Sequence, residues 1–570
     1  MKESIAHLAI YSRQRSYETC CIAAFCEDAL NKSIALAASL VCVAFALSGA
    51  YAGDEPAPAH HHEEGGTPPD QLGLVHFTTS CSPNVAPKFN RAMALLHSFW
   101  TKDAIAGFNG VLKDDPNCAI AYWGIAMALQ QNPLTAQQPS SQSAQDALAG
   151  LDKAKAIGAR TQRELDYLAA IDMIYRDADK TEFRARRLAY EKAMQALAQH
   201  YPDDTEAAIF YALALDMTAP LTDKTYANQL KAAAILEEVF KQQPEHPGVA
   251  HYLIHSYDYP AIADRGLPAA RVYTKIAPNN PHALHMPSHI FTRLGMWQES
   301  IDANVRSAAA AKAEGNGQEQ AHAMDYLVLA YLQLGEDAQA ERVVAESASV
   351  KVNPAIFVGN YALAAMPARF AVERRDWRGA TQLQLRPTPF LFPDALTRFA
   401  RGLGYARTGD AASAREEETQ LAQLRDGLAE KKDTYWSNQV EVQRLAVHAW
   451  IALANGQKDE GLRSMRMSAD LEDSMEKHIV TPSPVVPARE LLGEMLLEVG
   501  QPAEALQAFE SAAKREPNRL RGIFDSARAA TLSGDRDKAR TYYARLAALA
   551  GNGDGARAEV QQAKAYLAQQ

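Results

Sequence analysis

The feature that most constrains the fold is a pattern of small, apolar and proline residues that returns about every thirty-four positions. It is clearest at offsets 7, 8, 11, 15, 20, 24, 27 and 32 of one unit, occupied by Leu492, Gly493, Leu496, Gly500, Ala505, Phe509, Ala512 and Pro517. Small residues let paired helices approach closely, the aromatic ring fills the gap between them, and the proline ends the second helix. The period therefore predicts stacked helix-turn-helix units.

The same register returns along the chain. In the first unit the matching offsets are taken by Ala92, Ala104, Phe108 and Pro116, and further turns between helices are marked by Gly295, Gly335, Asp376, Gly409, Gly456 and Gly534. This pattern resembles the tetratricopeptide repeat. The resemblance implies an all-α fold, a right-handed superhelical solenoid whose first helices line a concave groove. We expect roughly ten to twelve units, in an N-terminal array over 74–345 and a C-terminal array over 346–570.

The N-terminal segment indicates export. An apolar run from Ile34 to Leu47 follows Lys32 and leads to small residues that end at Ala52. This order is typical of a secretory signal, and the run is short for a membrane span. We therefore expect a leader and signal over 1–52, cleaved after Ala52, and a periplasmic or secreted mature chain without a membrane span. An uncleaved membrane anchor is the alternative.

Residues 53–73 are rich in Pro, Gly, Glu and His, which predicts a disordered tether.

Cysteine usage agrees with export. Four of the six cysteines precede residue 53, which leaves Cys81 and Cys118. Two thiols in an oxidising compartment usually pair, and both precede the first helix of adjacent units. A disulfide there would hold the N-terminal end of the array. The alternative is a copper site that adds His97 and Met127, although neither CxxC nor CxxxC spacing is present.

The charge excludes one class of partner. The formal net charge is -10, and no basic patch is interleaved with aromatic residues. Nucleic acid is therefore not an expected partner. The family resemblance instead implies a protein or peptide partner in the concave groove.

Six histidines and one aspartate fall at matching positions in three consecutive units in the middle of the chain. They are His251, His255, His282, His285, His289, His322 and Asp325. Their spacings place them on one face of each first helix, at the offsets 2, 5 and 9 that in the tetratricopeptide family face the groove and commonly grip a peptide's carboxylate terminus. Adjacent helices are about 10 Å apart, a gap that two imidazoles and a metal can bridge. Several charged imidazoles this close would repel one another, so a metal or lowered pKa values are expected.

The donor types leave the metal and its role open. Zinc is the first choice and iron or copper also fit, because nitrogen donors plus Asp325 suit all three. One interpretation is an exported binding protein with this metal site in its groove. A second is a metalloenzyme that activates water or oxygen at His251, His255, His285 and His289, although the HExxH signature of metalloproteases is absent. A third is a metal-free assembly scaffold.

Neighbouring residues extend the candidate site. Tyr257, Asp258 and Arg293 lie farther along the same groove, where they could orient imidazoles or bind a ligand carboxylate. The alternative roles are packing for Tyr257 and a solvated ion pair for the two charges. Pro287, within HALHMPSHIF, either kinks its helix or starts it, and a start there would leave His282 and His285 on a loop.

Longer phrases carry a closer resemblance. They include HFTTSCSPNVAPKFNRAMALLHSFW, HYLIHSYDYP, HALHMPSHIFTRLGMW, HAMDYLVLAYLQLGE and PARELLGEMLLEVGQPAEAL. Together they resemble a group of exported bacterial tetratricopeptide-repeat proteins. The resemblance implies a fold, a location and partner binding through the groove, from about His76 onward, and it brings no activity.

Overall fold

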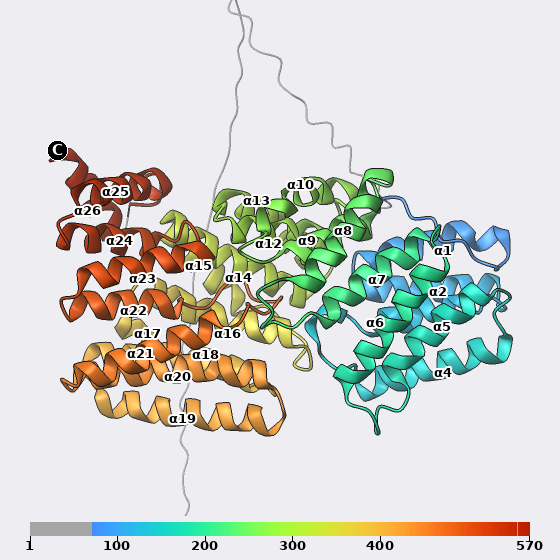
Figure 1. Cartoon of the computed structure of the whole chain (residues 1–570), viewed down its shortest axis with the longest axis horizontal. Coiled ribbons are helices and arrows are strands. Elements are labelled where there is room, and N and C mark those ends of the chain that lie inside the picture. Colours follow the sequence, from blue (N-terminus) through green and yellow to red (C-terminus); the bar gives the residue numbers. More distant parts are fainter. Residues whose placement is uncertain (1–70, 556, 570) are drawn as a thin grey trace, which may run out of the picture. The chain divides into compact units, whose positions relative to one another are not determined.

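The computed structural model describes residues 71–555 and 557–569, and every regular element among them is a helix (Figure 1). The predicted leader and signal, 1–52, and most of the predicted tether, 53–73, lie outside these residues. The described residues belong to one compact unit, Gly66–Gln570. The predicted boundary between 74–345 and 346–570 is not tested by this unit and stays a prediction.

The helices follow one another with short connections. The first half holds α1 (Ala86–His97), α2 (Thr101–Asp114), α3 (Ile120–Leu129), α4 (Ser141–Ile157), α5 (Gln162–Tyr175), α6 (Phe183–His200), α7 (Thr205–Thr218), α8 (Ala227–Gln242), α9 (Pro247–Tyr257), α10 (Leu267–Ile276), α11 (Pro281–His285), α12 (Pro287–Arg293) and α13 (Trp297–Ala313). The second half holds α14 (Gly317–Leu334), α15 (Asp337–Ser347), α16 (Phe357–Glu373), α17 (Trp377–Thr381), α18 (Leu391–Thr408), α19 (Ala411–Glu430), α20 (Thr434–Ala454), α21 (Lys458–Asp473), α22 (Ala488–Glu498), α23 (Pro502–Arg515), α24 (Leu520–Leu532), α25 (Arg536–Ala550) and α26 (Ala558–Ala568). Three short 3-10 helices join them, η1 (Pro83–Val85), η2 (Pro133–Thr135) and η3 (Ala263–Gly266).

The small and aromatic positions of the repeat meet as the sequence predicted. A β-carbon added at Gly493 would lie 2.5 Å from the ring of Phe509, so α22 and α23 pack closely only because position 493 has no side chain. Consecutive helices pack against one another along the whole described array. The all-helical fold of tetratricopeptide-repeat type is therefore confirmed.

The turns between paired helices share a left-handed backbone. Glycines with φ between 65° and 88° end the first helix of six units, at Gly295, Gly335, Gly409, Gly456, Gly500 and Gly534. Glycine suits this conformation because it has no β-carbon. Phe99 holds the corresponding turn between α1 and α2 with a φ of 51°. A bulky residue in this region is rare and costs roughly 1–2 kcal/mol. The turn alone therefore does not explain why this position holds a phenylalanine.

Cys81 and Cys118 are joined, with their sulfur atoms 2.02 Å apart. Cys81 precedes η1 and α1, and Cys118 precedes α3, as the repeat register predicted. The alternative copper site would need both thiols, which the disulfide occupies, and the His97 ring faces Glu206 at 2.9 Å. Among the described residues, no helix has both the length and the apolar character needed to cross a membrane.

The segment between α21 and α22, residues 474–487, contacts the first half of the array. The Glu476 amide donates to the Leu221 carbonyl at 2.8 Å, and its carboxylate accepts from Lys224 at 2.6 Å. Lys477 reaches Asp258 at 2.6 Å. This segment therefore contacts the connection between α7 and α8 and the end of α9.

Candidate metal centre

The six predicted histidines converge into two adjacent groups. Helix α9 carries His251 and His255, α11 carries His282 and His285, α12 carries His289, and α14 carries His322. The first histidine set consists of His251, His255 and His282, and the second of His285, His289 and His322. Within each set the candidate ligand atoms all lie within 4.8 Å of one another.

The distances within the sets match those between ligands of one metal ion. In the first set, the Nε2 atom of His251 lies 3.1 Å from that of His255 and 3.2 Å from that of His282. In the second, the Nε2 atoms of His285 and His289 are 3.0 Å apart. Nitrogens bound at 2.0–2.1 Å to one tetrahedral ion are about 3.3 Å apart. These three pairs of nitrogens are therefore about as close as two ligands of one tetrahedral ion.

Oxygen acceptors fix the opposite side of four of these rings. In the first set, Nδ1 of His251 faces the His97 carbonyl at 2.7 Å, and Nδ1 of His282 faces the Glu319 carboxylate at 3.3 Å. A carbonyl or carboxylate oxygen only accepts, so each Nδ1 carries a hydrogen. The buried, neutral His251 ring then presents the lone pair of its Nε2 atom toward Nε2 of His282.

The second set repeats this arrangement. Nδ1 of His289 donates to Asp258 at 2.8 Å, and Nδ1 of His285 donates to the Asn304 side-chain oxygen at 2.6 Å. The amide orientation of Asn304 is defined because its nitrogen donates to the Ser300 carbonyl. The Nε2 atoms of His285 and His289 therefore face each other without a hydrogen between them.

Burial keeps five of the six rings neutral. The exposed fraction is 0% for His251 and His285, 2% for His289 and 9% for His282, the most exposed of the six. Removal from water lowers the pKa of His285 to about 4, and it lowers the pKa of His251, His255, His289 and His322. Neutral imidazole is the form that binds metals. The sequence placed these positions on a groove, and the structure corrects this by burying them between helices.

Local sequence explains how the helices bring the rings together. A β-carbon at Gly248 would lie 2.3 Å from the His97 ring, so glycine allows α9 to approach the end of α1. Asn280 caps α11 by accepting from the amides of His282 and Ala283. Pro287 divides α11 from α12, but Met286 keeps a helical backbone with φ of -53°. His282 and His285 are therefore helical, and Pro287 starts the second short helix.

Two aromatic rings cover the two sets. The Phe99 ring lies against the first set, with its centroid 4.5 Å from that of His251, 5.6 Å from His282 and 6.2 Å from His255. The Tyr326 ring lies against all three rings of the second set, and its hydroxyl is 3.3 Å from Nε2 of His289. Phe99 thus holds a strained turn where its ring covers three imidazoles. Neither residue was predicted from the sequence. Phe99 could have been found, because it stands at offset 15, where six other units have glycine.

The remaining candidates lie in different places. Asp258 joins the site by holding His289, and it also accepts from Lys477. Asp325 pairs instead with Arg369 at 3.3 Å and belongs to neither set. Tyr257 donates to Glu237 at 2.6 Å, away from the imidazoles. Arg293 is buried rather than solvated, and it lies 3.2 Å from Glu516 and 3.6 Å from Asp258.

A third histidine group is held by hydrogen bonds alone. Glu206 bridges Nε2 of His97 at 2.9 Å and Nε2 of His246 at 3.0 Å, and His97 also contacts the Tyr252 hydroxyl. Although burial opposes its ionisation, the two histidines hold the pKa of Glu206 below its usual range. Each polar atom has a complementary partner, so this group needs no metal, and it fixes His97 where its carbonyl meets His251.

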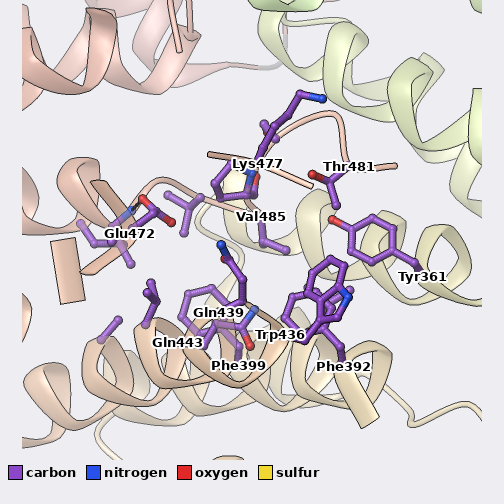
Figure 2. A pocket seen from close by; sticks show the side chains of 18 of the residues that line it. Tyr361, Phe392, Phe399, Trp436, Gln439, Gln443, Glu472, Lys477, Thr481 and Val485 are labelled. Atoms are coloured by element: carbon purple, nitrogen blue, oxygen red, sulfur yellow. Dashed lines mark hydrogen bonds between the residues drawn. The ribbon is translucent and has the colours of Figure 1, made fainter. Parts of the chain in front are cut away.

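A pocket is lined in part by the 474–487 segment (Figure 2). It encloses about 550 Å³, including space open to solvent, and its lining includes Tyr361, Phe392, Phe399, Tyr435, Trp436, Gln439, Gln443, Glu472 and Lys477. The stem of Lys477 lines the pocket, and its ammonium points away from Trp436 toward Asp258. Burial lowers the pKa of Lys477 to about 8 and raises that of Glu472 to about 8.

No family model and no curated protein matches this sequence. Among solved structures, it is similar to the Naa15/Naa10 complex bound to HypK-THB, with 10% identity, 85% of this chain and 91% of that chain covered, and a TM-score of 0.25. It is also similar to a human IFIT1 dimer with m7Gppp-AAAA, with 10% identity, 76% and 90% coverage, and a TM-score of 0.32. At these TM-scores neither likeness bears on function, and the fold assignment rests on the helix pairing and turn register described above.

Proposed function

We propose that this chain is a helical-repeat protein that binds transition-metal ions through its two histidine sets. The observation that carries the proposal is the pair of facing Nε2 atoms in each set, 3.2 Å apart between His251 and His282 and 3.0 Å apart between His285 and His289. Nδ1 of each of these rings donates its hydrogen to an oxygen on the opposite side. In the second set, where burial disfavours a proton between the rings, a shared metal cation relieves the repulsion between the two lone pairs.

The surroundings support a metal rather than packing alone. Histidine ligands usually donate their second nitrogen to a carboxylate or carbonyl, which fixes the ring and raises its basicity. Asp258, Glu319 and the His97 carbonyl supply such acceptors. Zinc, copper and iron all accept three imidazoles, with a fourth position left for a ligand. We also propose export, from the signal-like segment before Ala52, and partner binding by the repeat array.

Metal analysis of the purified full chain tests the proposal. After removal of metal with a chelator, the protein is dialysed against Zn²⁺, Fe²⁺ or copper, and the bound metal is measured by mass spectrometry. We expect stoichiometric binding of at least one of these metals, and loss of about one equivalent from His282→Gln or His289→Gln. The controls are His200→Gln at an exposed position and His478→Gln at a buried position outside both sets.

The variants separate the alternatives. Circular dichroism and thermal unfolding establish that each variant keeps the helical fold. Metal content that is the same in the set variants and in the two controls would support a metal-free scaffold and contradict the proposal. If a variant does not fold, the wild-type protein alone tests the proposal. Absence of bound metal after dialysis against all three ions would contradict it.

A further inference from the structure

We propose that the two histidine sets form one two-copper centre that binds a single dioxygen molecule between its ions. This inference rests on the proposed function, and it adds the number of ions, the metal and the ligand. Three observations carry it: the contact between the sets, the all-nitrogen donors, and the aromatic rings that cover the centre.

The two sets are in direct contact. The ring centroids of His255 and His289, one from each set, are 5.8 Å apart, and those of His282 and His285 are 6.3 Å apart. His282 and His285 belong to different sets but stand one turn apart on α11. Ions in the two sets would therefore be held by one rigid element. Two-metal sites share a ligand at separations of about 3.5–4 Å.

The donors favour copper. The sets contain six imidazoles and no carboxylate, because Asp325 is occupied by Arg369. The carboxylates that hold the rings are Glu319 and Asp258, and Asp258 shares its charge with Lys477. Two divalent ions would bring four positive charges into this buried site, whereas two Cu(I) ions bring two. Among divalent ions Cu(II) binds nitrogen donors most strongly. The site would therefore hold copper in both oxidation states.

The enclosure favours a small, uncharged ligand. Three imidazoles leave a coordination position open on each ion. Phe99 covers the first set, and Tyr326 packs against the second with its hydroxyl 3.3 Å from Nε2 of His289. All six histidine residues have exposed fractions of 9% or less, so a large substrate has no direct approach to the Nε2 atoms. Dioxygen is small and apolar enough to reach such a site.

Electrons balance without a further reactant. Each Cu(I) ion gives one electron and becomes Cu(II), and dioxygen accepts both electrons and bridges the ions at the level of peroxide. No proton is taken up and the O–O single bond remains. Release of dioxygen reverses the transfer. The Tyr326 hydroxyl is placed to donate a hydrogen bond to the bridging ligand, and Phe99 limits entry of water.

The test uses the full chain, freed of metal and loaded with Cu(I) without oxygen. We expect two copper ions per chain, uptake of one dioxygen per two ions, a new absorption band on oxygenation, and no electron paramagnetic resonance signal, since the two Cu(II) spins couple through the bridge. X-ray absorption should show a second copper at about 3.5–4 Å. His322→Gln in the second set should reduce binding to one ion and abolish dioxygen uptake, and His200→Gln is the matched exposed control.

The outcomes separate the two proposals. A chain that binds neither copper, zinc nor iron contradicts the proposed function. A chain that binds one ion, prefers zinc over copper at equal concentration, or binds two copper ions that give a full Cu(II) signal without dioxygen uptake overturns only the dioxygen inference. Tyr326→Phe keeps the ring and removes the hydroxyl. It should preserve the copper count and accelerate dioxygen release, which a purely structural Tyr326 would not do.

Discussion

Replacement of Asp258 by Asn should weaken the second histidine set and leave the first unchanged. The Asp258 carboxylate, 5% exposed, accepts from His289 at 2.8 Å and from Lys477 at 2.6 Å. A hydrogen bond to a charged group contributes about 1.5–3 kcal/mol. Lys477 already has a pKa lowered to about 8 by burial, and loss of the Asp258 charge lowers it further. Its release of a proton at pH 7 therefore costs less than about 1.4 kcal/mol and limits the further loss. We expect the metal-free protein to lose about 2–4 kcal/mol of unfolding free energy.

The same substitution should lower metal affinity about 10–100-fold at the second set, because the acceptor that orients His289 loses its charge. The matched variant is Glu319→Gln, which acts on His282 in the first set across 3.3 Å and with 25% exposure of the carboxylate. Its cost to stability should be below about 1 kcal/mol. Chemical denaturation measures the unfolding free energy, and competition with a coloured chelator measures the metal affinity. Equal weakening of both sets by Asp258→Asn would refute this account of the ring anchors.

Three further predictions concern the disulfide, the pocket and the covering ring. Joint replacement of Cys81 and Cys118 by Ser should lower the unfolding free energy by about 4 kcal/mol, as expected for a separation of 37 residues; an unchanged denaturation midpoint contradicts it. The pKa of Glu472 is raised to about 8, so the folded state holds this proton more tightly than the unfolded state. The contribution of Glu472 to stability should therefore fall by at most about 1.4 kcal/mol per pH unit as the pH rises from 5 to 8. The wild-type protein should lose stability relative to Glu472→Gln over this range, and a constant difference between the two proteins speaks against it. Phe99→Gly relieves the positive φ and uncovers the first set, so stopped-flow release of metal to a chelator should be faster with an unchanged metal count, and an unaltered rate would show that the ring is not a barrier.

The sequence predicted those parts of the fold and site that depend on short spacings. Gly500 and Gly534 end helices with positive φ because the turn requires it, and Gly493 meets Phe509 because both belong to one helix pair. His251 and His255 share a helix face for the same reason, since residues four apart lie one turn from each other. Local periodicity encodes all of these relations.

The rest depends on contacts between distant residues. Nδ1 of His251 meets a carbonyl 154 positions away, and Lys477 reaches Asp258 across 219 positions. No spacing rule relates such residues, so the contact of the 474–487 segment with Asp258 could not be foreseen. The pairing of Asp325 with Arg369 is of the same kind. A local pattern thus predicted which histidines share a face, and the tertiary packing divided them into two sets.

The most direct test of the central claim is an anomalous difference map from crystals of the full chain loaded with metal, recorded on either side of that metal's absorption edge. The account predicts strong peaks about 2.0–2.1 Å from the Nε2 atoms, one in the set of His251, His255 and His282 and one in the set of His285, His289 and His322. A map with metal elsewhere and featureless density between these rings would contradict the claim that the imidazoles form a metal centre.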